Sequence, residues 1–319
     1  MPATRLAVLD LARGLAVVAM AAYHLSWDLS WFGFVDWPVA QGGSWRILAA
    51  CIAGSFLFLA GVSLDLAHHK GVRWRAFGRR LAVIAAAAAA VSVATFFTFG
   101  DTYVRFGILH CIALSSVLAL PFTRWPFPVT VAAAAVVSTL PLWAASDGFD
   151  GQLWLWTGLG TPAYGSVDYV PLAPWAGVTL AGVAVSSLFR SARIWDRLSA
   201  IRAMGPPGRS TRFLGRHSLS VYLLHQPALY GLVWAATLLV GDVDRAANAF
   251  VRNCSVACQD TLGTADLCTN ACRCTVAALK SDGIWTALND APDTASLRER
   301  MNTRYAQCLA DPDMLQKLD

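Results

Sequence analysis

Long apolar stretches alternate with short polar loops over the first three quarters of the sequence. A helix rises about 1.5 Å per residue, so about 20 apolar residues are needed to cross the hydrocarbon core of a bilayer. The fourth and fifth apolar stretches are the weakest, because Pro121 and Pro126 crowd their junction. The pattern predicts an all-α, polytopic transmembrane bundle in residues 1–240. We expect about seven spans, near residues 6–27, 45–66, 81–99, 104–122, 126–144, 170–189 and 217–240.

The sequence is different after residue 240, because six of the eight cysteines lie in residues 245–319. In each of two pairs the cysteines stand four residues apart, which places both members of a pair on one helix face. Two antiparallel helices with a turn near Gly263 would bring the two pairs together. The predicted disulfides are Cys254–Cys272, Cys258–Cys268 and Cys274–Cys308.

Other interpretations of the cysteines are open at this point. Six cysteines can pair in many ways, so the predicted connectivity is a geometric hypothesis. A zinc site is the competing interpretation, although the two-residue ligand spacing typical of zinc sites is absent. Cys51 and Cys111 lie in apolar segments, where cysteine usually packs as a small apolar side chain. We predict a small, disulfide-stapled α-helical domain in residues 245–319 and no metal site.

Composition and charge support a membrane protein and orient it. Hydrophobic residues make up 56% of the chain and charged residues only 14%, compared with about 25% charged residues in soluble domains. Loops 67–80 and 190–216 are rich in Arg, whereas residues 28–44 and 145–169 contain no Lys or Arg. The positive-inside rule therefore places the N-terminus in the cytoplasm and the tail outside. Disulfides need an oxidising compartment, which agrees with this placement. We interpret the first apolar segment as a retained span, not a removed signal peptide.

Four ionisable residues interrupt the first apolar stretch, LDLARGLAVVAMAAYHLSWDL: they are Asp10, Arg13, His24 and Asp28. A charge inside a bilayer costs free energy, so such residues are functional candidates by default. Helical spacing places Asp10 near Arg13, and His24 near Asp28. Arg13 and His24 are three turns apart on nearly the same face, about 16 Å along the axis. The spacing predicts one polar stripe across the membrane.

His24 is the strongest candidate for chemistry in this stripe. Its ordinary pKa suits general base work at neutral pH, and Asp28 could orient the ring. Asp10 and Asp28 stand near the helix ends, where snorkelling to the interface explains them equally well. Asp10 and Arg13 could also form a structural clamp. We expect the catalytic residues to be His24, Arg13, Asp28 and Asp10.

Further polar and aromatic residues gather at mid-membrane to outer depth. A single histidine in a span is more often a packing residue, but three at similar depth predict a shared cavity. External aromatic residues could stack on a sugar, or could equally anchor the protein at the membrane interface. Pro227 is expected to kink the last span beside its polar pair. The candidate substrate-binding residues are His110, Trp154, Trp156, Tyr164, Asp168, Tyr169, His225 and Gln226.

Five blocks, in order, resemble bacterial members of the heparan-alpha-glucosaminide N-acetyltransferase family. Arg13 followed after ten residues by His24 also matches the signature of membrane acyltransferases that acetylate surface sugars. The resemblance covers about residues 5–240. The blocks are LDLARGLAVVAMAAYHLSWDL, GSFLFLAGVSL, RFGILHCIAL, VDYVPLAPWAGVTLAG and LGRHSLSVYLLHQP.

The resemblance implies acyl transfer from acetyl-CoA, which would reach the protein from the cytoplasm, to an amino or hydroxyl group of a sugar or glycan outside. His24 would act as base or transient acyl carrier, and Arg13 would face the thioester or pantetheine. The protein would lie in a bacterial cytoplasmic (inner) membrane, with the tail in the periplasm. Arginines in RWRAFGRR suit the phosphates of the co-substrate, although topology alone also explains them. The candidate acyl-CoA ligands are Arg13, Arg75, Arg79 and Arg80.

Two other functions fit the same pattern. A transporter or proton-relay channel for a small or lipid-linked substrate would use the polar stripe as a relay, although the inverted repeats common in transporters are not evident. An assembly or anchoring protein that presents the cysteine-rich tail is the weaker option. No basic stripe with interleaved aromatic residues indicates nucleic acid. The expected partners are membrane lipid, acyl-CoA and a sugar acceptor.

Overall fold

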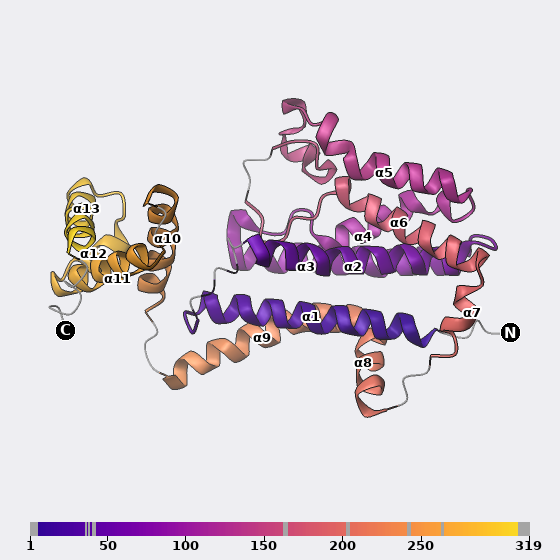
Figure 1. The fold of residues 1–319 in the computed structure, drawn as a ribbon, viewed down its shortest axis with the longest axis horizontal. Coiled ribbons are helices and arrows are strands. Elements are labelled where there is room, and N and C mark those ends of the chain that lie inside the picture. Colours follow the sequence, from indigo (N-terminus) through magenta and orange to yellow (C-terminus); the bar gives the residue numbers. More distant parts are fainter. Residues whose placement is uncertain are drawn as a thin grey trace. The chain divides into compact units, whose positions relative to one another are not determined.

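The computed structural model describes residues 6–35, 37, 39, 43–161, 165–201, 205–240, 244–262 and 265–311 (Figure 1). Helices make up 81% of the structure, and the described residues contain no strand, so the predicted all-α fold is confirmed. A helix occupies each of the seven predicted apolar segments. These helices are α1 (Ala7–Trp31), α2 (Gly43–His68), α3 (Trp74–Phe99), α4 (Ile108–Ala119), α5 (Phe127–Trp143), α6 (Leu172–Ser191) and α9 (Ser218–Val240).

The helices differ in their ability to cross a membrane. Within the described residues, α1, α2, α6 and the segment Trp74–Thr102 are long and apolar enough. The apolar helices α4 and α5 are shorter. Helix α4 has 12 residues, which is about 18 Å of helix, and begins four residues later than predicted. The reason is that residues before Ile108 are extended and bond to another loop, as Val170 N–H donates to Phe106 O.

The chain divides into two compact units, and each is described by itself. The first contains the residues up to Tyr23 and Ile47–Pro227; the second contains His24–Arg46 and Ala228–Asp319. These boundaries fall inside α1 and α9. The division at about residue 240 that the sequence indicates stays a prediction.

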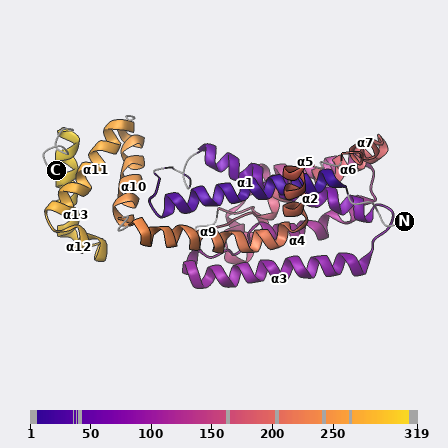
Figure 2. The same cartoon turned by 90° about the horizontal axis from the view of Figure 1, so that it is seen from below.

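Glycines set the helix packing of the first unit. Helices α5 and α6 lie side by side, and so do α3 and α4 (Figure 1 and Figure 2). Between α2 and α6, a Cβ at Gly61 would overlap the carbonyl oxygen of Thr179, and one at Gly182 would overlap that of Phe58. Small residues of this kind let helix backbones approach closely in a membrane. The two helices therefore touch backbone to backbone.

Gly61→Ala is expected to lower the free energy of unfolding in detergent by about 1–3 kcal/mol, because the new methyl group has no room against α6. Gly78→Ala on α3 is the matched control, since a Cβ there meets nothing within 4 Å. That substitution should leave stability unchanged or raise it by up to about 1 kcal/mol through helix propensity. Equal effects of the two variants would contradict this account of the packing.

A buried ion pair joins α2 to α6 in the same unit. Asp65 has no exposed surface. Its Oδ2 accepts hydrogen bonds from Arg190 Nη1 at 2.6 Å and from Ser186 Oγ at 2.7 Å. A buried carboxylate is tolerated only with such partners, so the pair fixes these helix ends together.

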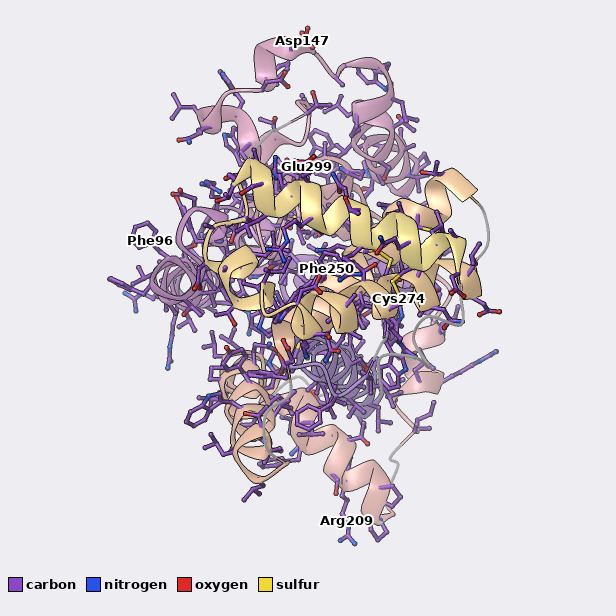
Figure 3. The ribbon with its side chains drawn as sticks, turned by 90° about the vertical axis from the view of Figure 1, so that its left-hand side faces the viewer. Phe96, Asp147, Arg209, Phe250, Cys274 and Glu299 are labelled. Carbon is purple, nitrogen blue, oxygen red and sulfur yellow. A yellow bond between two sulfur atoms is a disulfide. The ribbon has the colours of Figure 1, made fainter. Side chains whose placement is uncertain are left out.

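The second unit contains the cysteine-rich tail. It has the helices α10 (Arg245–Leu262), α11 (Ala265–Ser281), α12 (Trp285–Asp290) and α13 (Ala295–Ala310). The predicted connectivity is confirmed: the disulfides are Cys254–Cys272, Cys258–Cys268 and Cys274–Cys308. Figure 3 shows a disulfide beside the labelled Cys274. All six sulfurs of the tail are thus paired in disulfides. The predicted turn at Gly263 lies outside the described residues.

Packing and charge complete this tail. The ring of Phe250 on α10 meets the ring of Trp285 edge-on, with centroids 5.7 Å apart. Arg304 on α13 donates to both carboxylate oxygens of Asp282, at 2.6 and 2.7 Å. Helix α10 is also tied to the end of α1, because Arg252 Nη1 donates to Ser30 O at 3.0 Å. The tail therefore has its own core, disulfides and ion pair.

Candidate functional site

The first unit contains a cavity of about 640 Å³ that six helices line. Its walls come from α1, α2, α3, α4, α9 and the short helix α8 (Pro206–Arg216), which lies in the basic loop. Helix α8 reaches α1 through glycines: a Cβ at Gly215 would overlap Asp10 O, and one at Gly14 would overlap Thr211 O. This close approach brings a basic helix from late in the sequence to the first span.

Four arginines line one part of the cavity: Arg13, Arg79, Arg80 and Arg216. Asp10 is buried and bonds to two of them, with Arg216 Nε at 3.1 Å and Arg13 Nη1 at 3.7 Å. Arg13 also donates to Ser63 Oγ on α2. Four guanidinium charges against the Asp10 carboxylate leave a positive excess. Such a lining favours an anionic ligand with several charges, because the paired N–H donors of a planar guanidinium group match the spacing of phosphate and carboxylate oxygens.

The rest of the cavity is apolar. Helices α2, α3, α4 and α9 contribute aliphatic side chains, and Tyr222 of α9 adds an aromatic ring. A charged region that continues into an apolar one is typical of sites for amphiphilic small molecules. The apolar residues at the wall include Phe56, Leu59, Ile84, Ile108, Leu109, Ile112 and Leu219.

Asp168 and His110 each bond to a backbone N–H at the N-terminus of α4, whose first residue, Ile108, lines the cavity. Oδ2 of Asp168 accepts from Ile108 N–H at 3.1 Å. Nδ1 of His110 accepts from Gly107 N–H at 3.2 Å, so in the neutral ring the proton is on Nε2, which lies 3.4 Å from Ser92 Oγ. That hydroxyl donates to Val104 O at 2.6 Å and can accept from Nε2. Both ring nitrogens of His110 therefore have structural partners.

The surroundings of Asp168 change its acidity. Asp168 as a residue is only partly buried. Loss of hydration nevertheless raises the pKa of Asp168 to about 6, and the hydrogen bond from Ile108 N–H opposes this rise in part. A carboxyl with such a pKa exchanges its proton near neutral pH.

His225 is a buried residue of α9. Its Nδ1 lies 2.7 Å from Tyr222 O and 3.2 Å from Val221 O. Carbonyl oxygens only accept, so Nδ1 donates, and Nε2 is the unprotonated nitrogen of the neutral ring. The ring centroid is 5.9 Å from that of Tyr222, a cavity residue. Gln226 follows it on the same helix.

The aromatic residues that the sequence predicts to be external lie on and beside the short 3-10 helix η4 (Gln152–Thr157). Trp154 and Trp156 are exposed. Tyr169 donates its hydroxyl proton to Leu155 O at 2.8 Å, which fastens η4 to the loop before α6. Tyr164 lies outside the described residues. A role for these residues in sugar binding stays a prediction.

His24 and Asp28 lie on α1, in the part that belongs to the second unit. His24 is half-buried and Asp28 is buried. Their roles, and their position relative to the cavity, stay predictions. Arg75 is exposed on α3 and is not among the cavity-lining residues, unlike Arg79 and Arg80.

Sequence reasoning missed Arg216 and Tyr222 as site residues. Both lie in the block LGRHSLSVYLLHQP. The missed signal was their sequence neighbourhood: the same block contains the predicted His225 and Gln226. The sequence offers Arg216 only as one of the many arginines of the basic loop 190–216, and its bond to Asp10 spans 206 positions of sequence.

Comparison with known proteins identifies the family. A model of the catalytic domain of heparan-alpha-glucosaminide N-acetyltransferase matches residues 5–227, which is more than two thirds of the chain. No curated protein and no solved structure gives a significant match. Every residue that lines the cavity lies inside the matched range, as do Asp10, His24 and Asp168. The chain therefore belongs to the heparan-alpha-glucosaminide N-acetyltransferase family.

Proposed function

We propose that this membrane protein moves an acetyl group from acetyl-CoA to an amino or hydroxyl group of a sugar or glycan at the outer face. The cavity supports this most directly, because four arginines at one part and apolar walls at the other suit one ligand with phosphates and a long uncharged arm. Acetyl-CoA has that form. Its phosphates would bind Arg79, Arg80 and Arg216, and its arm would follow the apolar wall.

Arg13 is proposed to face the thioester or pantetheine end. Its guanidinium is held by Asp10 and Ser63, so it needs little reorganisation when a ligand binds. His24 is proposed as general base or transient acyl carrier, with Asp28 one turn away to orient the ring. Helix α1 runs unbroken from Ala7 to Trp31 and thus contains all four residues of the predicted stripe.

We further propose a bacterial cytoplasmic membrane, with the N-terminus in the cytoplasm and the tail in the periplasm. Two independent features support this orientation. Loops 67–80 and 190–216 are basic, as cytoplasmic loops are. The tail has three disulfides, which form and persist in oxidising compartments.

The test is incubation of membranes that contain the protein with acetyl-CoA labelled in the acetyl group. Glucosamine and glucose serve as soluble amine and hydroxyl acceptors, and extracted native lipid-linked glycans as a third. We expect the label in a sugar product, with release of one coenzyme A thiol per acetyl group. Membranes without the protein are the control. No labelled product with any acceptor, together with proton flux in vesicles that lack acyl-CoA, would overturn the proposal in favour of a transporter.

A further inference from the structure

The loop before α6, residues 165–170, lies along the loop before α4, residues 102–107. Phe106 and Tyr169 form an isolated parallel bridge. Arg105 Nη1 also donates to Gly165 O at 2.9 Å. We call residues 165–170 the strap. Its remaining bonds run from Val167 N–H to Thr102 O, from Val170 N–H to Phe106 O and from Ser166 Oγ to Tyr103 O.

The strap places one carboxylate against the start of α4. Oδ2 of Asp168 accepts from Ile108 N–H at 3.1 Å. A Cβ at Gly107 would overlap this oxygen, so only glycine admits the carboxylate there. The helix N-terminus and its N–H groups favour the negative charge. Oδ2 is therefore held in place at the start of α4.

The second oxygen of Asp168 differs from the first. No hydrogen bond from any described residue reaches Oδ1, and Asp168 as a residue is only partly buried. One anchored oxygen beside one available oxygen is the arrangement that a carboxylate needs to accept a substrate proton in a fixed direction. The hydrogen bonds that hold the strap in place do not use Oδ1, so this oxygen can accept a proton from a substrate.

Asp168 is also close to the cavity. Ile108, from whose N–H Asp168 accepts a hydrogen bond, lines the cavity. Leu109, the next residue of α4, packs with Ile84 and Ala88 of α3, one to two turns beyond Arg80. The carboxylate therefore lies against the apolar part of the cavity wall, which it contacts through Ile108.

We propose that Asp168 is a catalytic residue of the acceptor half-reaction, and that its Oδ1 binds and deprotonates the attacking amino or hydroxyl group, while His24 has the role of transient acyl carrier. This inference rests on the proposed acetyl transfer. The acceptor nitrogen or oxygen forms a bond to the acetyl carbonyl carbon, and its proton moves to Oδ1. The bond from that carbon to the imidazole nitrogen of His24 breaks, and the electron pair stays with that nitrogen. Over the whole cycle the coenzyme A thiolate takes up the proton that the acceptor loses, so the net proton count is unchanged.

If Asp168 is the base, the rate of acetyl transfer should depend on pH. Only the carboxylate form accepts a proton, and the protein raises the pKa of Asp168 to about 6. The rate should therefore rise with pH through about 6 and then level off. Other ionisable groups nearby are His110 and Cys111 of α4, Tyr222 of α9, and Arg105 and Tyr169 of the two paired loops.

The decisive variant is Asp168→Asn in the full chain, purified in nanodiscs. Its amide oxygen can still accept from Ile108 N–H, so the strap should stay docked, but it cannot take a proton. We expect the rate of acetyl transfer to glucosamine to fall about 10²-fold. The Kd for acetyl-CoA should stay unchanged, which also verifies folding, and the rise of rate through pH 6 should disappear. Asp168→Glu, which keeps a carboxylate, should restore part of the rate and that rise.

Ser166→Ala is the matched control, because it removes strap bonds to Tyr103 O and Asp168 O and leaves the carboxylate in place. It should keep the pH profile and most of the rate. An equal loss in Ser166→Ala and Asp168→Asn, or a wild-type rate in Asp168→Asn, would overturn the inference while acetyl transfer stands. Absence of product from the wild-type protein with every acceptor would overturn the proposed function, and this inference with it.

Discussion

His24→Ala should lower the rate of acetyl transfer by about 10³-fold and leave acetyl-CoA binding nearly unchanged. A positioned general base contributes about 10² to 10⁴ in rate, and loss of an acyl carrier costs at least as much. His24 is half-buried on a continuous helix, so alanine removes the imidazole without breaking the helix. The measurement is release of the coenzyme A thiol at saturating acetyl-CoA and glucosamine, with Kd measured separately.

His69→Ala is the matched control for this change. That ring lies at the end of α2, and its Nδ1 is 3.0 Å from Asp65 O, outside the cavity lining. Its removal should alter the rate by less than about two-fold. Rapid acid quenching, followed by mass spectrometry of the peptide that contains His24, separates the two roles, because only a carrier gains an acetyl group. Full activity in His24→Ala would remove the central claim of the proposed mechanism.

Local periodicity explains why so much of the fold could be predicted. A helix face repeats every three to four residues, so cysteines four apart must share a face. That rule gave Cys254–Cys272 and Cys258–Cys268 from spacing alone, and the structure contains both. The apolar lengths of α1, α2, α3 and α6 likewise determined where helices form.

Contacts between distant segments were not predictable in the same way. Residues 104–107 belong to the predicted fourth span, but Phe106 O accepts from Val170 N–H and the backbone of Val104 bonds to the side chains of Ser92 and Thr95. Helix α4 is consequently shorter than its hydropathy indicates. The approach of Arg216 to Asp10 depends on glycine contacts between α1 and α8, which no periodicity within one segment encodes.

The arginines of α3 show how structure separates residues that sequence cannot. The positive-inside rule explains Arg73, Arg75, Arg79 and Arg80 equally well. In the structure one face of α3 lines the cavity, because the lining residues recur at helical spacing. Arg73, which precedes α3, and Arg75 are not among them. The lining residues of this helix are Ala76, Arg79, Arg80, Val83 and Ile84.

The double variant Arg79→Ala/Arg80→Ala should therefore raise the KM for acetyl-CoA about 10²- to 10³-fold with a much smaller change in kcat. Each charge-assisted hydrogen bond contributes about 1.5–3 kcal/mol, and about 1.4 kcal/mol corresponds to a factor of ten in binding. The phosphates lie far from the reacting carbonyl carbon. Loss of their arginine contacts should therefore weaken binding of the ground state and of the transition state alike. The measurement is steady-state kinetics at several salt concentrations, with Kd from equilibrium dialysis of labelled acetyl-CoA.

Arg73→Ala/Arg75→Ala removes the same charge from the same loop and helix but from outside the cavity lining. If the arginines act only through topology or a general positive field, both double variants should weaken binding equally, and salt should abolish the effect in both. If the phosphates contact the cavity, only Arg79→Ala/Arg80→Ala should raise KM strongly, and the difference should persist at high salt. Arg79→Lys/Arg80→Lys should then recover part of the affinity, because lysine supplies the charge without the planar fork of hydrogen-bond donors.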